Sequence, residues 1–136
     1  MTILSAVTRL CEQRTGHRIP ILVHGYDYAV PDGRGFAGGW GFLPGPWLEP
    51  GFREKGYEDK KEVRLDLVKQ MIDRFNEMLQ GMVKSPSFSH VKYIDLRNTL
   101  SFGNNYKKDW ANELHPTAAG FERVTNRFAS ILDALP

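Results

Sequence analysis

The stretch Asn112-Glu-Leu-His-Pro-Thr117 holds the side chain best suited to chemistry in this chain. His115 is expected on a loop just before an amphipathic helix, and Pro116 fixes the turn between them. An imidazole changes its charge near neutral pH, so a histidine held at such a junction is suited to act as a general base. Asn112 and Glu113 are near enough in the sequence to orient the ring. The alternative is a histidine that caps the helix or lies on the surface without a chemical role.

Further polar residues follow the predicted strands. One strand is expected to end at His24-Gly-Tyr-Asp-Tyr28 and a second at Asp95-Leu-Arg97. Ligands of open α/β sheets bind beyond the carboxyl ends of the strands, and the loop with His115 follows the second strand. These groups could therefore meet at one edge of the sheet. Tyr26 and Asp27 are candidate substrate-binding residues, although Asp27 could instead cap the turn that opens the next loop.

Residues 29–56 are predicted to form one long loop that is rich in glycine and proline. A disordered linker would carry few aromatic residues, whereas this segment contains Phe36, Trp40, Phe42, Trp47 and Phe52. A loop of this length in a compact domain is usually functional. Trp40 and Trp47 could wall a substrate pocket, and they could equally pack the loop onto the domain.

Other kinds of site have less support. The scattered residues that could ligate a metal are His24, Asp27, Asp95 and His115. Their spacing matches no compact metal motif, so we expect no metal. Neither Ser89 nor Ser101 stands in a Gly-x-Ser-x-Gly turn. The segment Gly33-Arg-Gly35 lacks the following helix that a phosphate cradle needs, and we expect no cofactor.

The elements that must position these residues alternate in type. Helical spacing of apolar residues predicts helices near 2–15, 58–83 and 117–134, and short apolar runs predict strands near 19–25 and 90–96. The two strands with the helix between them form a βαβ unit, so the strands should be parallel. The predicted class is α/β. Two parallel strands make a poor sheet with an unpaired edge. We therefore expect either a homodimer that completes the sheet or the back half of a larger domain.

Composition sets further bounds. A length of 136 residues fits a single domain, 1–136. The formal charge of +2 is too small to indicate nucleic-acid binding, and no apolar run approaches the length of a membrane span. Cys11, the one cysteine, is expected to be a small buried apolar residue. The N-terminus does not resemble a signal peptide, so a cytoplasmic location is expected if Met1 is the natural start.

Three stretches, taken in order, resemble the C-terminal half of the SGNH (GDSL-type) hydrolase family. They are His24-Gly-Tyr-Asp-Tyr28, Asp95-Leu-Arg-Asn-Thr-Leu100 and Asn112-Glu-Leu-His-Pro-Thr117. Members of the family are esterases, lipases and carbohydrate deacetylases with a three-layer α/β/α, flavodoxin-like fold. The family carries Asp-x-x-His just before its final helix, and the resemblance implies that His115 is the base of a Ser-His-Asp triad. It extends over nearly the whole chain, and it implies a small-molecule ester or an acylated sugar as substrate.

The chain departs from the family pattern in two ways. The aspartate position falls on Asn112, and an amide cannot stabilise an imidazolium as a carboxylate does. This exchange in a triad can lower turnover by ~10⁴, unless Asp109 or Glu113 takes over the role. In addition, the motifs that supply the serine nucleophile and the oxyanion hole match no stretch of these 136 residues. We therefore expect the chain to be inactive alone. The alternatives are a ligand-binding module without catalysis or a self-associating module.

Overall fold

The computed structural model of the chain describes residues 3–35, 45–57 and 60–134. The main elements are α1 (Ile3–Thr15), β1 (Ile21–His24), α2 (Glu49–Glu54), α3 (Lys61–Val83), β2 (Val91–Ile94) and α4 (Ala118–Leu132). Two short 3₁₀ turns, η1 (Pro86–Phe88) and η2 (Tyr106–Lys108), flank β2 in the sequence. The predicted α/β class is confirmed, because the helices accompany a small parallel sheet.

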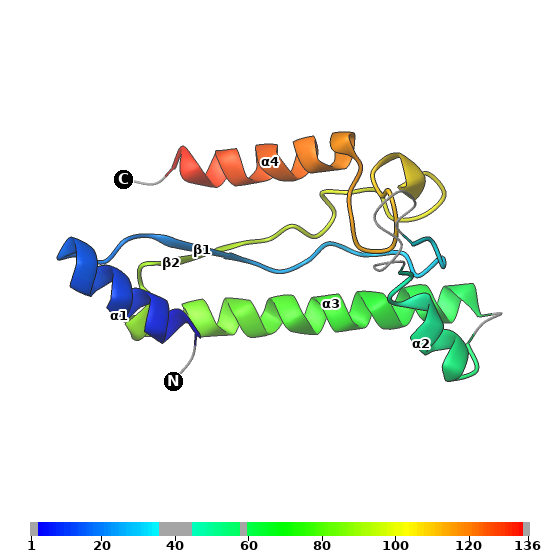
Figure 1. Cartoon of the computed structure of the whole chain (residues 1–136), viewed down its shortest axis with the longest axis horizontal. Helices are drawn as coiled ribbons and strands as arrows, with labels where there is room; N and C mark the ends of the chain where they lie inside the picture. The colour runs from blue at the N-terminus through cyan, green and yellow to red at the C-terminus, as the bar shows by residue number, and fades with distance from the viewer. Residues whose placement is uncertain (1–2, 36–44, 58–59, 135–136) are drawn as a thin grey trace.

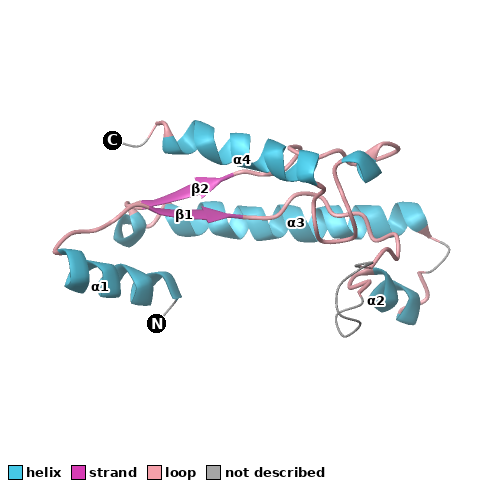
Figure 2. Cartoon of the chain, turned by 45° about the horizontal axis from the view of Figure 1, so that its top comes forward, coloured by secondary structure: helices cyan, strands magenta, loops and turns pink. Residues whose placement is uncertain are grey.

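β1 and β2 pair in parallel over four residues each, from Ile21 opposite Val91 to His24 opposite Ile94. Figure 1 shows the two strands between α3 and α4, and the rotated view in Figure 2 shows the same arrangement. α3 runs back along the strands and provides the crossover between them. The sheet buries Val91 and Ile94 of β2, whereas the residues of β1 are half-buried or exposed. The prediction of a parallel βαβ unit is therefore confirmed.

The densest part of the core lies past the carboxyl ends of the strands. Its buried members come from the loops that follow β1 and β2 and from the first half of α3; they are Ala29, Val30, Val68, Leu100, Tyr106 and Trp110. Trp110 is 1% exposed, and partly buried apolar side chains of the loop before α2 pack against the cluster. The core thus forms around the loops that carry the predicted site, so these loops are held by packing.

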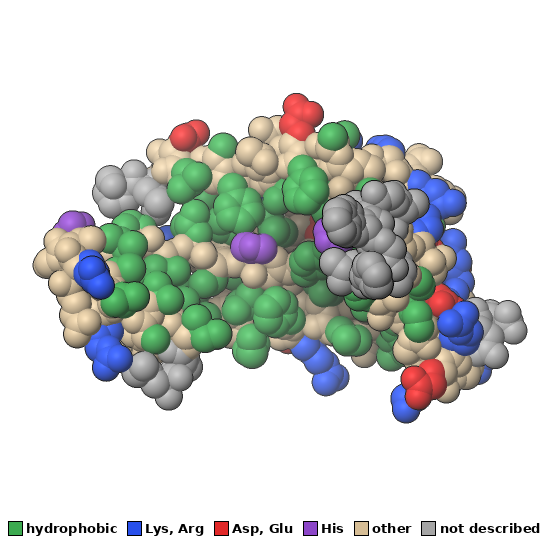
Figure 3. All heavy atoms as spheres, viewed as in Figure 1, with side chains coloured by type: hydrophobic (Ala, Val, Ile, Leu, Met, Phe, Trp, Pro, Cys, Tyr) green, Lys and Arg blue, Asp and Glu red, His purple; other side chains and the backbone are tan. Residues whose placement is uncertain are grey.

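The small sheet leaves strand edges without a strand neighbour. In the described part of the chain β1 and β2 each pair with a strand on one side only. Figure 3 shows hydrophobic side chains gathered over one face, between α4 and α3 and across the strands. The large apolar residues with high exposure include Ile3, Leu10, Met71, Met78 and Phe121. An exposed apolar face of this kind marks a surface that binds another chain or segment.

The structure differs from the sequence prediction in several details. Residues 29–56 are not one continuous loop, because Glu49–Glu54 form α2. The strands are shorter than predicted, with four residues each. Cys11 is half-buried and not fully buried. Trp40, a candidate pocket residue, lies outside the described residues.

Candidate functional site

The loop before α4 holds His115 by its ring and by its backbone. The Asn112 Oδ1 accepts hydrogen bonds from the backbone N–H groups of Leu114 and His115, at 3.0 and 2.9 Å. The same oxygen lies 3.0 Å from Nδ1 of the imidazole. The two backbone N–H donors identify this atom as the amide oxygen, and because an amide oxygen can only accept, Nδ1 carries the proton. The His115 carbonyl accepts from Ala111 N–H at 2.8 Å, which closes the loop.

This arrangement fixes the tautomer of His115. With Nδ1 as donor, Nε2 carries the lone pair, which is the form that a general base requires. The His115 side chain is exposed, and the Trp47 ring lies against it edge-on, with ring centroids 5.5 Å apart. The geometry therefore places Asn112 in the orienting position that the sequence predicted, with an amide in place of a carboxylate.

A cavity of about 510 Å³ opens next to His115, past the carboxyl ends of both strands. Apolar side chains from the strand ends, the loop and α4 form most of its wall. The lining residues are His24, Tyr26, Asp27, Leu96, Leu100, Trp110, Leu114, His115, Pro116, Phe121 and Val124. The position agrees with the rule for ligands of open α/β sheets. Its volume lies within the usual range of small-molecule pockets.

Two further aromatic groups line this wall. His24 donates from Nδ1 to the Gly25 carbonyl at 2.8 Å, because a carbonyl oxygen can only accept. Burial raises the pKa of Tyr26 to about 12, so its hydroxyl stays protonated at neutral pH. The Tyr26 ring also packs on Trp110, with centroids 5.8 Å apart. The structure thus brings Tyr26 to the same cavity as His115.

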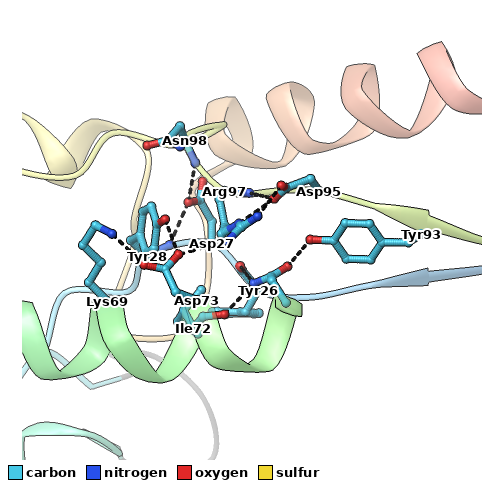
Figure 4. A network of polar contacts seen from close by, with 11 residues as sticks. Tyr26, Asp27, Tyr28, Lys69, Ile72, Asp73, Tyr93, Asp95, Arg97 and Asn98 are labelled. Carbon is cyan, nitrogen blue, oxygen red and sulfur yellow. Dashed lines mark hydrogen bonds and ion pairs between the residues drawn. The ribbon is translucent and has the colours of Figure 1, made fainter. Parts of the chain in front are cut away.

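Asp27 lines the cavity, yet its oxygens bind the backbone. It is 4% exposed and accepts from Tyr28, Asn98 and Leu100 N–H groups at 2.7, 2.9 and 2.6 Å. Figure 4 shows the carboxylate between the loop after β1 and the loop after β2. Burial raises the pKa of Asp27, and the hydrogen bonds from backbone N–H groups, which lower it, do not fully offset this effect. The geometry favours the alternative in which Asp27 organises the turn, because it joins the two loops that form the cavity.

A second polar layer lies beneath these loops. Asp73 of α3 accepts from the Tyr28 hydroxyl at 2.7 Å, from Arg97 at 3.0 Å and from Lys69 at 2.6 Å. Figure 4 shows this chain of contacts running on through Arg97 to Asp95. The hydrogen bond from Lys69 is the main reason that the pKa of Asp73 falls to about 2. The network ties α3 to both strand ends, and it uses Asp95 away from the cavity.

Asn76 of α3 is a completely buried residue that joins the helix to β2 and to the loop after β1. Its Nδ2 donates to the carbonyls of Ile72 at 2.7 Å and Tyr26 at 3.4 Å, and its Oδ1 accepts from the Tyr93 hydroxyl at 2.6 Å. Gly25 lies directly over this amide, where an added Cβ would be 2.0 Å from Asn76 Oδ1. A glycine is thus required at the end of β1, between two residues of the cavity wall.

The Asp109 carboxylate contacts Ser101 and Arg123. It is 1% exposed, its Oδ2 accepts from Ser101 N–H at 2.7 Å and its Oδ1 lies 3.5 Å from Arg123 of α4. Burial would raise the pKa of Asp109, but hydrogen bonds from Ser101 and the nearby cations leave it below its ordinary value. Its backbone carbonyl accepts from Thr117 N–H at 2.8 Å. Asp109 therefore fastens the start of α4, and Asn112 is the residue that contacts the His115 ring.

Glu113, which follows Asn112, is fully buried. Its carboxylate accepts four backbone N–H groups: those of Gly33, Trp47 and Leu48 in the loop between β1 and α2, and that of Glu49, the first residue of α2. Sequence reasoning placed Glu113 near His115 but missed this contact with the loop. It also missed Arg34 and Asn76, because their partners are distant in the sequence.

No family model, curated protein or solved structure matches the chain. Within residues 3–35, 45–57 and 60–134, no group of three or more His, Cys, Asp or Glu residues could hold a metal ion. Across the same ranges, every helix is too short or too polar to cross a bilayer. The site must therefore be interpreted from its own geometry.

Proposed function

We propose that the chain is the histidine-bearing half of an SGNH-like ester hydrolase. The observation that carries the proposal is the Asn112–His115 pair at the mouth of a 510 Å³ cavity. His115 has its Nδ1 proton fixed and its Nε2 lone pair available, as a base for a serine hydroxyl must have. In the complete enzyme the two strands described here would belong to a larger three-layer, flavodoxin-like sheet.

The wall of the cavity indicates the class of substrate. Its residues are mainly apolar, and the buried Asp27 already binds three backbone N–H groups. An acyl group of an ester or of an acylated sugar would fit such a wall, with Trp47 beside the imidazole. Tyr26 would line the acyl site, with its protonated hydroxyl as a hydrogen-bond donor. Because Asn112 supplies an amide, we expect a slower enzyme than one with a carboxylate.

The serine and the oxyanion donors would come from a segment that pairs with the free edge of β1. Two features support this assembly: β1 ends at His24, which lines the same cavity as His115, and the face around the strand is apolar. Unpaired strand edges are templates for further strands. A strand added here would end next to the imidazole, which is where the nucleophile must be.

The first experiment is to read the reading frame upstream of the Met1 codon. If that frame is open and encodes a Gly-Asp-Ser turn, the longer protein should hydrolyse p-nitrophenyl butyrate, and the 136 residues alone should not. His115→Ala should then lower kcat by at least about 10³, as expected for loss of a triad base. His17→Ala is the matched control, because His17 is exposed on the loop after α1.

Two results would contradict the proposal. One is a longer protein whose esterase rate survives His115→Ala. The other is a specific rate of the 136-residue chain that vanishes in His115→Ala, because the nucleophile would then be present in this chain.

The second candidate is a non-catalytic module that self-associates through the β1 edge. The exposure of Ile3, 83%, and of Leu10, 55%, favours it, because apolar side chains of a helix are normally covered. Light scattering at micromolar concentration should then give a dimer. A stable monomer would count against it.

If a small ligand binds, loss of binding in Trp47→Ala but not in His115→Ala would favour a binding module over an esterase.

A further inference from the structure

The Glu113 carboxylate gathers two stretches of the loop between β1 and α2. Gly33 N–H donates to Oε1 at 2.9 Å, and Glu49 N–H donates to the same oxygen at 3.0 Å. Trp47 and Leu48 N–H groups both donate to Oε2 at 2.7 Å. The two stretches lie on either side of residues 36–44. One side chain therefore holds both of them against the loop of His115.

Arg34 strengthens the same junction from the other side. Its backbone carbonyl accepts from Glu113 N–H at 3.3 Å. Its guanidinium donates from Nη1 to the carbonyls of Trp110 and Ala111, at 3.0 and 3.1 Å. The segment with Gly33 and Arg34 and the loop that carries Glu113 therefore each donate hydrogen bonds to the other and accept hydrogen bonds from it. Backbone polar groups in buried loops need such partners, and here the two loops satisfy one another.

The junction determines what lies next to the imidazole. Trp47 donates its backbone N–H to Glu113, and its ring lies 5.5 Å from the His115 ring. Leu48, also held by Glu113, packs on the core cluster that includes Trp110. Trp47 is 41% exposed, and Gly45 lies against its indole ring. The hydrogen bond from its backbone to Glu113 helps to set where the ring lies.

We infer that Glu113 is a positioning residue, which acts through Trp47 to fix the side wall of the His115 site. This inference rests on the proposed function only because it treats His115 as the reacting group. The chemistry requires a glutamate, because two carboxylate oxygens can accept all four N–H groups and their negative charge strengthens each bond. A glutamine would keep one acceptor oxygen and point an NH₂ group at backbone donors.

The test measures the loop amides and the imidazole ring directly, and it needs no ester hydrolysis. In the 136-residue chain we would measure amide hydrogen exchange and the imidazole NMR signals of His115 in wild type and in Glu113→Gln. The matched control is Glu122→Gln, the same change at an exposed position of α4. The amides of Gly33, Trp47, Leu48 and Glu49 should exchange at least about tenfold more slowly than unstructured amides in wild type.

In Glu113→Gln these four amides should lose protection together, while amides of β2 keep theirs. The His115 ring signals should shift in Glu113→Gln and, by a similar amount, in Trp47→Ala. The double variant should shift no further, because both changes act through one contact. Glu122→Gln should leave all these signals unchanged. A glutamate with a merely structural role would not give this shared effect on the ring.

The inference is overturned if Glu113→Gln leaves the four amides protected, or if Trp47→Ala leaves the His115 signals in place. If Glu113→Gln does not fold, two other measurements decide the test: the hydrogen exchange of the four amides in wild type, and the His115 ring signals in Trp47→Ala. Unprotected amides or an unmoved ring would then reject the inference, and protected amides with a moved ring would support it. Because no rate enters, failure here leaves the esterase proposal standing, and the converse also holds.

Discussion

Gly25 and Asn76 fit so closely that the cost of enlarging one should depend on the other. A Cβ at residue 25 would lie 2.0 Å from Asn76 Oδ1 and 2.5 Å from its Cγ. The buried amide cannot move freely, because it is hydrogen-bonded to Ile72 and Tyr93. Overpacking of this kind costs about 1–3 kcal/mol, and we take about 2 kcal/mol for Gly25→Ala.

Asn76→Ala removes the obstacle and its hydrogen bonds. Two short hydrogen bonds at about 1 kcal/mol each, together with the space left behind, give a loss of about 3 kcal/mol. In this background the methyl group of Ala at position 25 has room. The backbone there is outside the positive φ range, so Gly→Ala should be neutral or stabilise by about 0.5 kcal/mol through the unfolded chain.

The double variant should therefore lose about 3 kcal/mol and not the additive 5 kcal/mol, a coupling of about 2 kcal/mol. Urea unfolding followed by circular dichroism measures it. With a slope of about 2 kcal/mol per M, the midpoint of each variant moves by about 1 M or more. Asn126→Ala, at an exposed position of α4, controls for helix propensity. Losses that add within about 0.5 kcal/mol would refute the reasoning.

Three further predictions concern charge. The pKa of Asp73 is lowered to about 2, chiefly by the hydrogen bond from its lysine partner. Its stabilising effect should therefore be present above the ordinary carboxyl range and be lost as pH falls towards 2; Asp73→Asn should flatten this acid limb in urea titrations. Burial raises the pKa of Asp27 in the folded chain, so the free energy of unfolding should fall as pH rises through this raised pKa and the carboxyl group ionises. Asp27→Asn should remove this decline, and an unchanged pH profile would contradict it. Asn112→Asp puts a carboxylate 3.0 Å from the His115 Nδ1. The NMR titration midpoint of the ring should rise by about 1–3 pH units, so folding should gain stability at low pH that is lost as pH rises through the new midpoint. An unmoved midpoint would show that the side chain has left the ring.

The parts of the fold that sequence reasoning predicted are those with local causes. The amphipathic helices and the two apolar strands follow from periodicity, and their parallel pairing follows from the βαβ connection. α2 was not predicted in this way, because Gly51 disfavours a helix interior and Pro50, which lies in the first turn of α2, suits a loop as well as a helix start. The backbone N–H groups at the start of α2 find their acceptor outside the segment, because those of Leu48 and Glu49 donate to the Glu113 carboxylate. A helix that depends on a side chain 64 residues away leaves no signal in its own sequence.

The residues of the candidate site were also predictable only where their contacts are local in the sequence. Asn112 could be linked to His115 because an amide three residues before a histidine can reach both its backbone and its ring. Glu113 and Asp109 were plausible orienting groups by the same reasoning, but each is committed to backbone donors of another segment. The buried acids around this histidine therefore build the loops, and among these three polar side chains the Asn112 amide is the one hydrogen-bonded to the ring. A chain that uses its carboxylates in this way fixes one tautomer of the neutral imidazole through Asn112. Under the proposed function, the charge of the reacting state would have to be balanced by groups that enter along the free edge of β1.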